Sequence, residues 1–331
     1  MGSGSPHVVP DPRHSRLTGR RAPVLYEMKT RERDLLLGCS RNRPRRKGRG
    51  VSEDRIHRVV SHDGTELAAR VHGQGPPLLL LPAGPGNSET TWRSLVPLLS
   101  ERFTCYLVNT RGRGMSEDHP DHAPARLAED VKAFADSIDA PVGVAEWGSC
   151  SWALVTADSG TSIAAVAAYE SGAVEMLTDE AAARLEEAFA RVAELVEQDR
   201  LVEAARSFVA ESDVIYTDED LADGAPSEFW EAAAPNLPIF LREEEAAEAD
   251  PSSPTDPSVL EQVDVPVLVL QGTRTRPWFV DSTKHIAEHL TTPVVREIPG
   301  AAHFGPYRQP QAIANELIRF FTARLRSTTV R

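Results

Sequence analysis

The stretch VGVAEWGSCSWAL (residues 142–154) decides the fold of this chain. Its small and apolar first residues predict a short buried strand, the glycine at its centre predicts a tight turn, and the residues that follow predict a helix. A turn between a strand and a helix is a place where an enzyme can expose a catalytic side chain. The candidates for that position are Glu146, Trp147, Ser149, Cys150 and Ser151.

Patterns typical of alternating strands and helices surround this stretch. The antiparallel hairpin predicted first turns at Asp63-Gly64, a dipeptide that favours tight turns. The apolar runs that predict further strands are 76–84, 103–110, 141–145, 162–170, 265–272 and 292–300. The helical patterns between and after them are 91–102, 124–139, 150–160, 281–290 and 309–325. This alternation predicts an α/β fold with a mostly parallel sheet and right-handed crossovers.

One long segment interrupts the alternation. Residues 172–258 are rich in Ala and Glu, follow a helical pattern and contain no convincing strand. Ligands bind at the carboxyl edge of the sheet in open α/β folds. We therefore expect a helical cap at 172–258 over that edge, inserted into a core made of 51–171 and 259–331.

Composition bounds the class of protein. The chain has 331 residues and a net charge of −13. Residues 1–50 contain 13 Lys or Arg and 4 Asp or Glu, a balance of +9, and the remainder contains 23 and 45 of them, a balance of −22. We expect 1–50 to be a disordered basic extension, and an acidic folded part argues against a nucleic-acid partner. No apolar run is long enough for a membrane helix. Three scattered cysteines predict no disulfide framework or zinc site and favour the cytoplasm. The sequence leaves the oligomeric state open.

Three loops, taken in order, carry a family resemblance. LPAGPGNSETTW (81–92), NTRGRGMS (109–116) and IPGAAHFGPYRQP (298–310) resemble, in that order, three characteristic loops of the α/β-hydrolase superfamily. Ala83-Gly84 stands where His-Gly is usual, and Asn109 stands where the family has Asp. The resemblance covers about residues 55–328. It implies the α/β-hydrolase fold, with His303 as the catalytic histidine.

The turn itself resembles one branch of that superfamily. Haloalkane dehalogenases and epoxide hydrolases place a nucleophilic Asp before Trp-Gly-Gly or Trp-Gly-Ser, and Glu146-Trp147-Gly148-Ser149 matches this motif with Glu for Asp. Frames that make Ser149 or Ser151 the nucleophile put bulky residues beside a strained turn. The resemblance therefore implies Glu146 at the nucleophile position, with Cys150 in the following helix.

A carboxylate that orients the histidine completes such a catalytic set. The loop after 265–272 offers no carboxylate in the usual frame. Some haloalkane dehalogenases carry this acid after the strand that follows the nucleophile helix, and here that strand ends in Glu170, 170 − 146 = 24 residues beyond Glu146. The resemblance thus implies a catalytic set of Glu146, Glu170 and His303.

The remaining predicted site residues surround this set. An oxyanion hole would use the backbone of Trp147 and of the loop at Gly84, Pro85 and Gly86, where proline has no N–H to donate. Cap aromatics that could line a substrate pocket are Phe229, Trp230 and Phe240.

These residues allow three functions. The first is hydrolysis of a small, apolar ester, epoxide or similar substrate, with Glu146 as the nucleophile in a reshaped pocket, together with His303 and Glu170. The second is lyase or isomerase chemistry of natural-product biosynthesis, with Glu146 as general base. The third is binding of a small molecule without catalysis. No phosphate loop, metal cluster or dinucleotide fingerprint occurs, so we expect no cofactor and no metal.

Overall fold

The computed structural model describes residues 55–148, 152–157, 161–223, 227–250 and 253–325. These belong to one unit, Ser52–Arg331. The predicted basic extension, Cys39, and the turn residues Ser149, Cys150 and Ser151 lie outside the described residues, so the predictions made for them are not tested.

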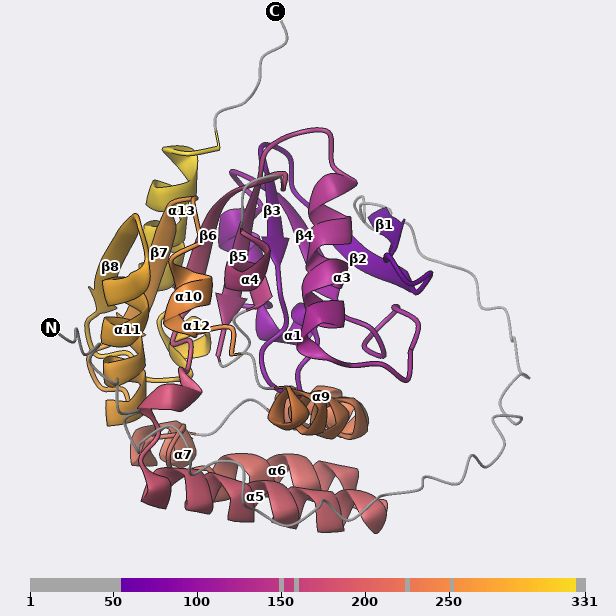
Figure 1. The fold of residues 1–331 in the computed structure, drawn as a ribbon, viewed down its shortest axis with the longest axis vertical. Helices are drawn as coiled ribbons and strands as arrows, with labels where there is room; N and C mark the ends of the chain where they lie inside the picture. The colour runs from indigo at the N-terminus through magenta and orange to yellow at the C-terminus, as the bar shows by residue number, and fades with distance from the viewer. Residues whose placement is uncertain (1–54, 149–151, 158–160, 224–226, 251–252, 326–331) are drawn as a thin grey trace, which may run out of the picture. The chain divides into compact units, whose positions relative to one another are not determined.

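An eight-stranded sheet forms the centre of this unit, as Figure 1 shows. Its strands are β1 (Arg55–Val60), β2 (Glu66–His72), β3 (Pro77–Leu80), β4 (Thr104–Asn109), β5 (Val142–Trp147), β6 (Ile163–Tyr169), β7 (Val267–Gly272) and β8 (Pro293–Ile298). The spatial order is β1-β2-β4-β3-β5-β6-β7-β8. The β1–β2 and β2–β4 pairs are antiparallel, and β4-β3-β5-β6-β7-β8 is parallel. The predicted fold class is confirmed.

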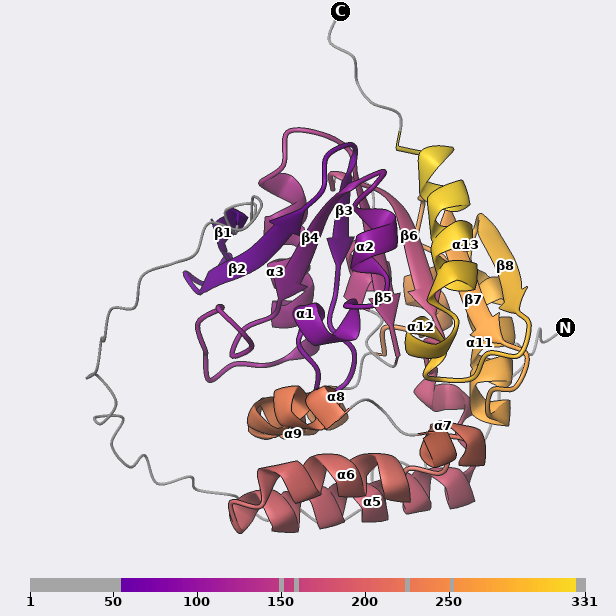
Figure 2. The ribbon, with the colours of Figure 1, turned by 180° about the vertical axis from the view of Figure 1, so that it is seen from behind.

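Helices cover both faces of the sheet. One face carries α3 (Pro124–Asp136), α4 (Trp152–Thr156), α10 (Pro257–Leu260) and α11 (Pro277–His289). The opposite face carries α2 (Val96–Leu99) and α13 (Pro310–Thr322), which stand in front in Figure 2. The parallel strands at the centre are buried on both faces, which explains their continuous apolar sequences.

Two predicted elements differ from the structure. The helix predicted at 91–102 is instead two single turns, α1 (Ser88–Thr91) and α2, with Pro97 near the start of α2. Proline cannot donate a backbone hydrogen bond to the preceding turn, so one continuous helix does not form. The strand predicted at 141–145 continues through Trp147, because Glu146 and Trp147 pair in register with Ala168 and Tyr169 of β6.

The segment between β6 and β7 is helical, as its composition predicts. It contains the 3-10 turn η2 (Val174–Met176), α5 (Asp179–Glu197), α6 (Leu201–Glu211), α7 (Asp218–Asp223), α8 (Ser227–Ala233), η3 (Ala234–Asn236) and α9 (Leu237–Ala249). We call these elements the helical insertion. Its described residues include no strand, and helices α5, α6 and α9 lie beyond one end of the sheet (Figure 1).

Two further sequence predictions concern the setting of the protein. No described helix is long and apolar enough to cross a membrane. Cys105 on β4 is buried with a free thiol, and burial raises the pKa of that thiol to about 12. A cytoplasmic location stays a prediction.

Candidate active site

Glu146 is part of β5 and does not occupy the tip of the turn. Its side chain is 1% exposed. Oε2 accepts a hydrogen bond from the backbone N–H of Ala153 on α4 (3.1 Å), and Oε1 lies 3.5 Å from the Ser171 hydroxyl. Burial raises the pKa of this carboxyl to about 8, more than the two hydrogen bonds lower it. The carboxyl thus joins the end of β5 to the helix that follows.

Gly148 is the first residue beyond β5, and it has the backbone conformation of a tight turn. Its φ is +91°, in the region that favours glycine, and its N–H donates to the carbonyl of Tyr169 (3.0 Å). Glu146 has no such positive φ. A Cβ added to Gly148 would meet no heavy atom within 4 Å. The position at the turn that was predicted for Glu146 is therefore occupied by Gly148. Glu146 itself lies two residues earlier, inside the strand, because β5 extends beyond the apolar run that ends at Ala145.

Glu170 and His303 form a buried pair, as their predicted places in the fold require. Glu170 follows β6 directly, with φ +48°, and its side chain is fully buried. Its Oε2 accepts from His303 Nδ1 at 3.0 Å, and its Oε1 accepts from the N–H of Gly272 at the end of β7 (2.9 Å). Because both carboxylate oxygens have donors, the carboxylate is fixed and in turn fixes the imidazole ring.

Aromatic rings surround the imidazole of His303. Phe279 stacks on it, with ring centroids 4.8 Å apart and planes 9° apart. Tyr216 meets it edge-on at 5.3 Å, and Trp147 lies at 5.7 Å. His303 is 6% exposed. With Nδ1 bonded to Glu170 and the ring held between aromatic neighbours, Nε2 is the nitrogen left for chemistry.

A narrow cavity of about 30 Å³ lies next to this pair. A cavity of this size has room for roughly one or two water molecules. Its walls come from the loop after β3, the end of β5, the insertion, α11 and the His303 loop. The lining residues are Ala83, Gly84, Pro85, Trp147, Gly148, Phe208, Ile215, Tyr216, Phe229, Phe240, Trp278, Phe279, His303 and Phe304. Eight of these fourteen are Phe, Tyr or Trp, so the cavity is mostly apolar and aromatic, with the imidazole of His303 in its wall.

The predicted oxyanion loop lies at this cavity, but its three residues differ in what they offer. Gly84 and Pro85 line the cavity. The Gly86 N–H donates to the Ala83 carbonyl at 2.8 Å, so it is not free for a substrate. Among the described residues the Gly84 N–H has no partner, and it is the donor that this loop offers.

The side chain of Arg113 binds the backbone of the same loop. Its guanidinium is 2% exposed and donates to the carbonyl oxygens of Gly84 and Gly86, the latter at 2.8 Å. It also forms a buried ion pair with Glu243 on α9. The glycine-rich sequence around Arg113 does not indicate that its partner comes from the insertion, 130 residues later.

The aromatic residues predicted for the pocket are separated by the structure. Phe229 and Phe240 line the cavity. Trp230 does not line it and instead meets Phe229 edge-on with ring centroids 5.1 Å apart. On a helix, adjacent residues point about 100° apart, so Phe229 and Trp230 cannot share one face. Phe208, Tyr216, Phe279 and Phe304 are lining residues that the sequence analysis missed.

Trp147 brings its side chain to the cavity. Its backbone belongs to β5, in register with Tyr169. The indole is 2% exposed and lines the cavity, and its Nε1 is buried without a hydrogen-bond partner among the described residues. A residue after the strained turn would supply the second oxyanion donor, and this position falls outside the described residues.

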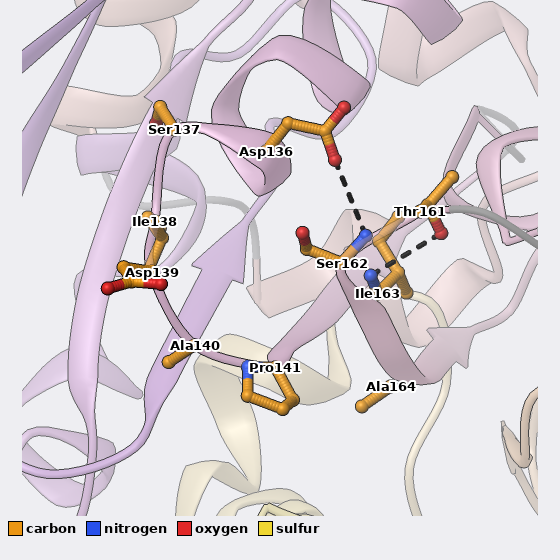
Figure 3. Close-up of a pocket in the computed structure, with 10 residues that line it drawn as sticks. All are labelled: Asp136, Ser137, Ile138, Asp139, Ala140, Pro141, Thr161, Ser162, Ile163 and Ala164. Carbon is orange, nitrogen blue, oxygen red and sulfur yellow. Dashed lines mark hydrogen bonds between the residues drawn. The ribbon is translucent and has the colours of Figure 1, made fainter.

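A second, wider hollow lies at the opposite ends of β5 and β6 (Figure 3). Here Asp136 accepts a hydrogen bond from the Ser162 N–H (3.4 Å), and Thr161 Oγ1 accepts from the Ile163 N–H (3.4 Å). The described residues that line it include no histidine or cysteine. Across the described part of the chain, no group of three or more His, Cys, Asp or Glu side chains is arranged to hold a metal ion.

Comparison with known proteins agrees with this architecture. The sequence model of the α/β hydrolase family matches residues 78–316, which is more than half of the chain. The protein therefore belongs to the α/β hydrolase family. No curated protein matches the sequence.

Solved structures of the same fold include several enzymes. An α/β hydrolase from Sphaerobacter thermophilus DSM 20745 is 26% identical, with 80% of this chain and 100% of that chain covered and a TM-score of 0.61. The esterase RhEst1 from Rhodococcus sp. ECU1013 is 22% identical, with 82% and 99% covered and a TM-score of 0.64. The epoxide hydrolase CorEH is 18% identical, with 82% and 99% covered and a TM-score of 0.59. At these identities the last two show the shared fold alone.

Proposed function

We propose that the protein is a hydrolase in which His303, oriented by Glu170, activates a water molecule directly. The 3.0 Å hydrogen bond between His303 Nδ1 and Glu170 Oε2 carries this proposal. Nε2 would take a proton from water as the water oxygen attacks the carbonyl carbon of an ester or a carbon of an epoxide. The Gly84 N–H would stabilise the charge on the substrate oxygen, and the proton would then pass to the leaving oxygen.

This proposal changes the role expected of Glu146. A nucleophile must reach the substrate, whereas Glu146 is buried, bonded to α4 and absent from the cavity lining. Gly148 is the lining residue at the turn, with open space beside it for a water or a substrate atom. We assign Glu146 the task of holding β5 and α4 together in its protonated form.

The cavity supports a neutral, aromatic or aliphatic substrate. The described residues that line it include no Lys, Arg, Asp or Glu, and a charged group moved there would lose its hydration without a partner. Since typical ligand pockets are about 300–1,000 Å³, a substrate would have to displace side chains of the insertion. We therefore propose that the insertion acts as a cap that opens for substrate.

Phe229 and Trp230 allow a matched test of this pocket. Phe229→Ala should raise KM for p-nitrophenyl butyrate about tenfold, because the lost ring removes roughly 1–3 kcal/mol of apolar contact. Trp230→Ala removes a larger ring from the neighbouring position, outside the cavity, and should leave KM within about threefold. Initial-rate kinetics of both variants measure this difference. Equal effects of the two substitutions would contradict the assigned pocket.

The source of the oxygen in the product tests the reaction itself. In one turnover with enzyme in excess in ¹⁸O-labelled water, direct attack by water puts the label into the product acid or diol. Attack by a carboxylate such as Glu146 puts protein oxygen into the product and the label into the enzyme. We expect labelled product and unlabelled protein, with p-nitrophenyl butyrate and styrene oxide as probes and mass spectrometry as the measurement. A covalent adduct mapped to residues 146–151 would overturn the proposal.

A lyase or isomerase is the second candidate function. It is favoured by Gly148, which provides no side chain for a covalent intermediate, together with a histidine base in an apolar cavity. In that case His303 would remove a proton from carbon. The product would then carry no oxygen from labelled water. In deuterium oxide, an isomerase would place deuterium on a carbon of the product, and a lyase would release the abstracted hydrogen to solvent.

A further inference from the structure

The two peptide groups that flank His303 have hydrogen-bond partners on opposite sides. The carbonyl oxygen of Ala302 accepts from the hydroxyl of Tyr169, the last residue of β6, at 2.6 Å. The N–H of Phe304 donates to Oδ1 of Asp220 on α7 at 3.1 Å. Because peptide groups are planar, these two bonds set the backbone angles of His303. The sheet therefore holds one side of this residue and the helical insertion holds the other.

Asp220 is a buried carboxylate with donors on both oxygens. It is 1% exposed. Oδ2 accepts from the N–H and the hydroxyl of Thr217 at 2.9 and 2.8 Å, and Thr217 Oγ1 accepts from the Asp220 N–H at 3.1 Å. This reciprocal arrangement is a capping box at the start of α7. The box uses only one carboxylate oxygen, and the second is bonded to the loop that carries His303.

Other contacts bring the start of α7 onto the same loop. Tyr216, the residue before the capping Thr217, stacks on Phe304 with centroids 5.1 Å apart and planes 27° apart. Arg308, the last residue of the single-turn helix α12 (Gly305–Arg308) that follows the loop, donates from Nη2 to the carbonyl oxygen of Asp220 at 3.3 Å. The Asp220 side chain thus lies inside a packed contact between the insertion and the His303 loop, not on a solvent-exposed helix end.

We propose that Asp220 is a positioning residue, which holds the His303 backbone in its working geometry when the insertion lies over the cavity. This inference rests on the proposed function, since it requires His303 to be the base. The carboxylate does not touch the imidazole ring, so it acts through the Phe304 peptide. A displacement of about 1 Å in a reacting group can cost on the order of 100-fold in rate.

A pair of variants separates this role from simple stabilisation of α7. Asp220→Ala removes the capping box and the acceptor for Phe304, whereas Thr217→Ala removes hydroxyl bonds of the box and leaves the Phe304 bond in place. With p-nitrophenyl butyrate, we expect Asp220→Ala to lower kcat about 10- to 100-fold with KM within about threefold. Thr217→Ala should keep kcat within about twofold even where both variants lose melting temperature. Equal loss of kcat in the two variants, or no loss in Asp220→Ala, would overturn the inference.

Amide hydrogen exchange keeps the test decisive if Asp220→Ala does not fold. The side chain in Asp220→Asn has one acceptor oxygen, which can accept either from the Phe304 N–H or from Thr217. The exchange rate of the Phe304 amide in the full chain shows whether the Phe304 bond is kept. We expect kcat to fall in proportion to the protection that this amide loses. Lost protection with wild-type kcat, or retained protection with a low kcat, would contradict the inference. Activity of a His303→Ala variant would instead contradict the proposed function.

Discussion

Replacing His303 with alanine is expected to lower kcat/KM by about 10³-fold, to near the uncatalysed rate. General-base catalysis contributes roughly 10²–10⁴-fold, and among the described residues that line the cavity no other side chain takes a proton from water near neutral pH. The measurement is hydrolysis of p-nitrophenyl butyrate and of styrene oxide by the purified full chain. The melting temperature should also fall, because the buried carboxylate of Glu170 loses the donor to its Oε2, at a cost of roughly 1–3 kcal/mol.

A companion variant at Glu170 makes this expectation sharper. In Glu170→Gln, the Gly272 N–H should hold the amide oxygen, since that N–H needs an acceptor. The amide NH₂ then faces His303 Nδ1 and can only donate to it, which forces the ring hydrogen onto Nε2. The ring would keep its place but lose its basic nitrogen. Loss of this orienting carboxylate can cost on the order of 10⁴-fold in a serine-protease triad, and we expect at least a 10²-fold loss here.

The control for both variants is His289→Ala, at the end of α11. His289 Nδ1 is bonded to the His285 carbonyl (2.9 Å), and the residue does not line the cavity. Its substitution should leave kcat/KM within about twofold. If His303→Ala kept a tenth or more of wild-type activity, water activation by His303 would be excluded and a different group would have to act as the base.

The sequence predicted the sheet because the central parallel strands β3 and β7 are apolar runs, bounded by Pro and Gly, that alternate with helical patterns. It also predicted where Glu170 and His303 would lie, since both follow strands whose carboxyl ends meet at one edge. The residue at which β5 ends could not be predicted from the sequence. Whether Glu146 and Trp147 extend the strand depends on pairing with Ala168 and Tyr169 of β6, which is a contact between distant residues.

The helical insertion, too, could be predicted from the sequence only in part. Its helices follow from composition and spacing, but the partners of its buried polar groups do not. Asp220 sits in the sequence TDED, which is typical of a helix start, yet nothing local indicates that its second oxygen reaches Phe304. Glu243 likewise looks like one residue of an acidic helix face, and only the folded chain pairs it with Arg113. Such pairs depend on how the insertion is placed over the sheet.

Replacing Glu146 with glutamine is expected to make the protein more stable at alkaline pH while leaving it active. Burial raises the pKa of Glu146 to about 8, from an ordinary value of 4.5. Below pH 4.5 the carboxyl is protonated in both the folded and the unfolded chain. As pH rises from 4.5 to 8, the unfolded chain releases the proton and the folded protein retains it, so the free energy of unfolding falls. Above pH 8 the loss is complete.

Glutamine has the shape of the protonated carboxyl and does not titrate. Its oxygen can accept from the Ala153 N–H, and its NH₂ can donate to the Ser171 hydroxyl. The free-energy difference between wild type and variant should therefore be small at pH 5 and reach several kcal/mol at pH 9. That corresponds to a melting temperature roughly 5–10 °C higher for the variant at pH 9. Melting curves at half-unit pH intervals measure it.

The control and the activity of this variant distinguish the two roles of Glu146. Glu261→Gln makes the same change at an exposed position and is the matched control for the melting curves. Glu146→Gln should keep kcat/KM within about threefold, because a protonated structural carboxyl is replaced by its neutral equivalent. Loss of all activity, together with a flat stability difference, would mean that Glu146 works as an ionised group. Its carboxylate would then have to leave Ala153 and reach the cavity during the reaction, which would return it to the role of nucleophile.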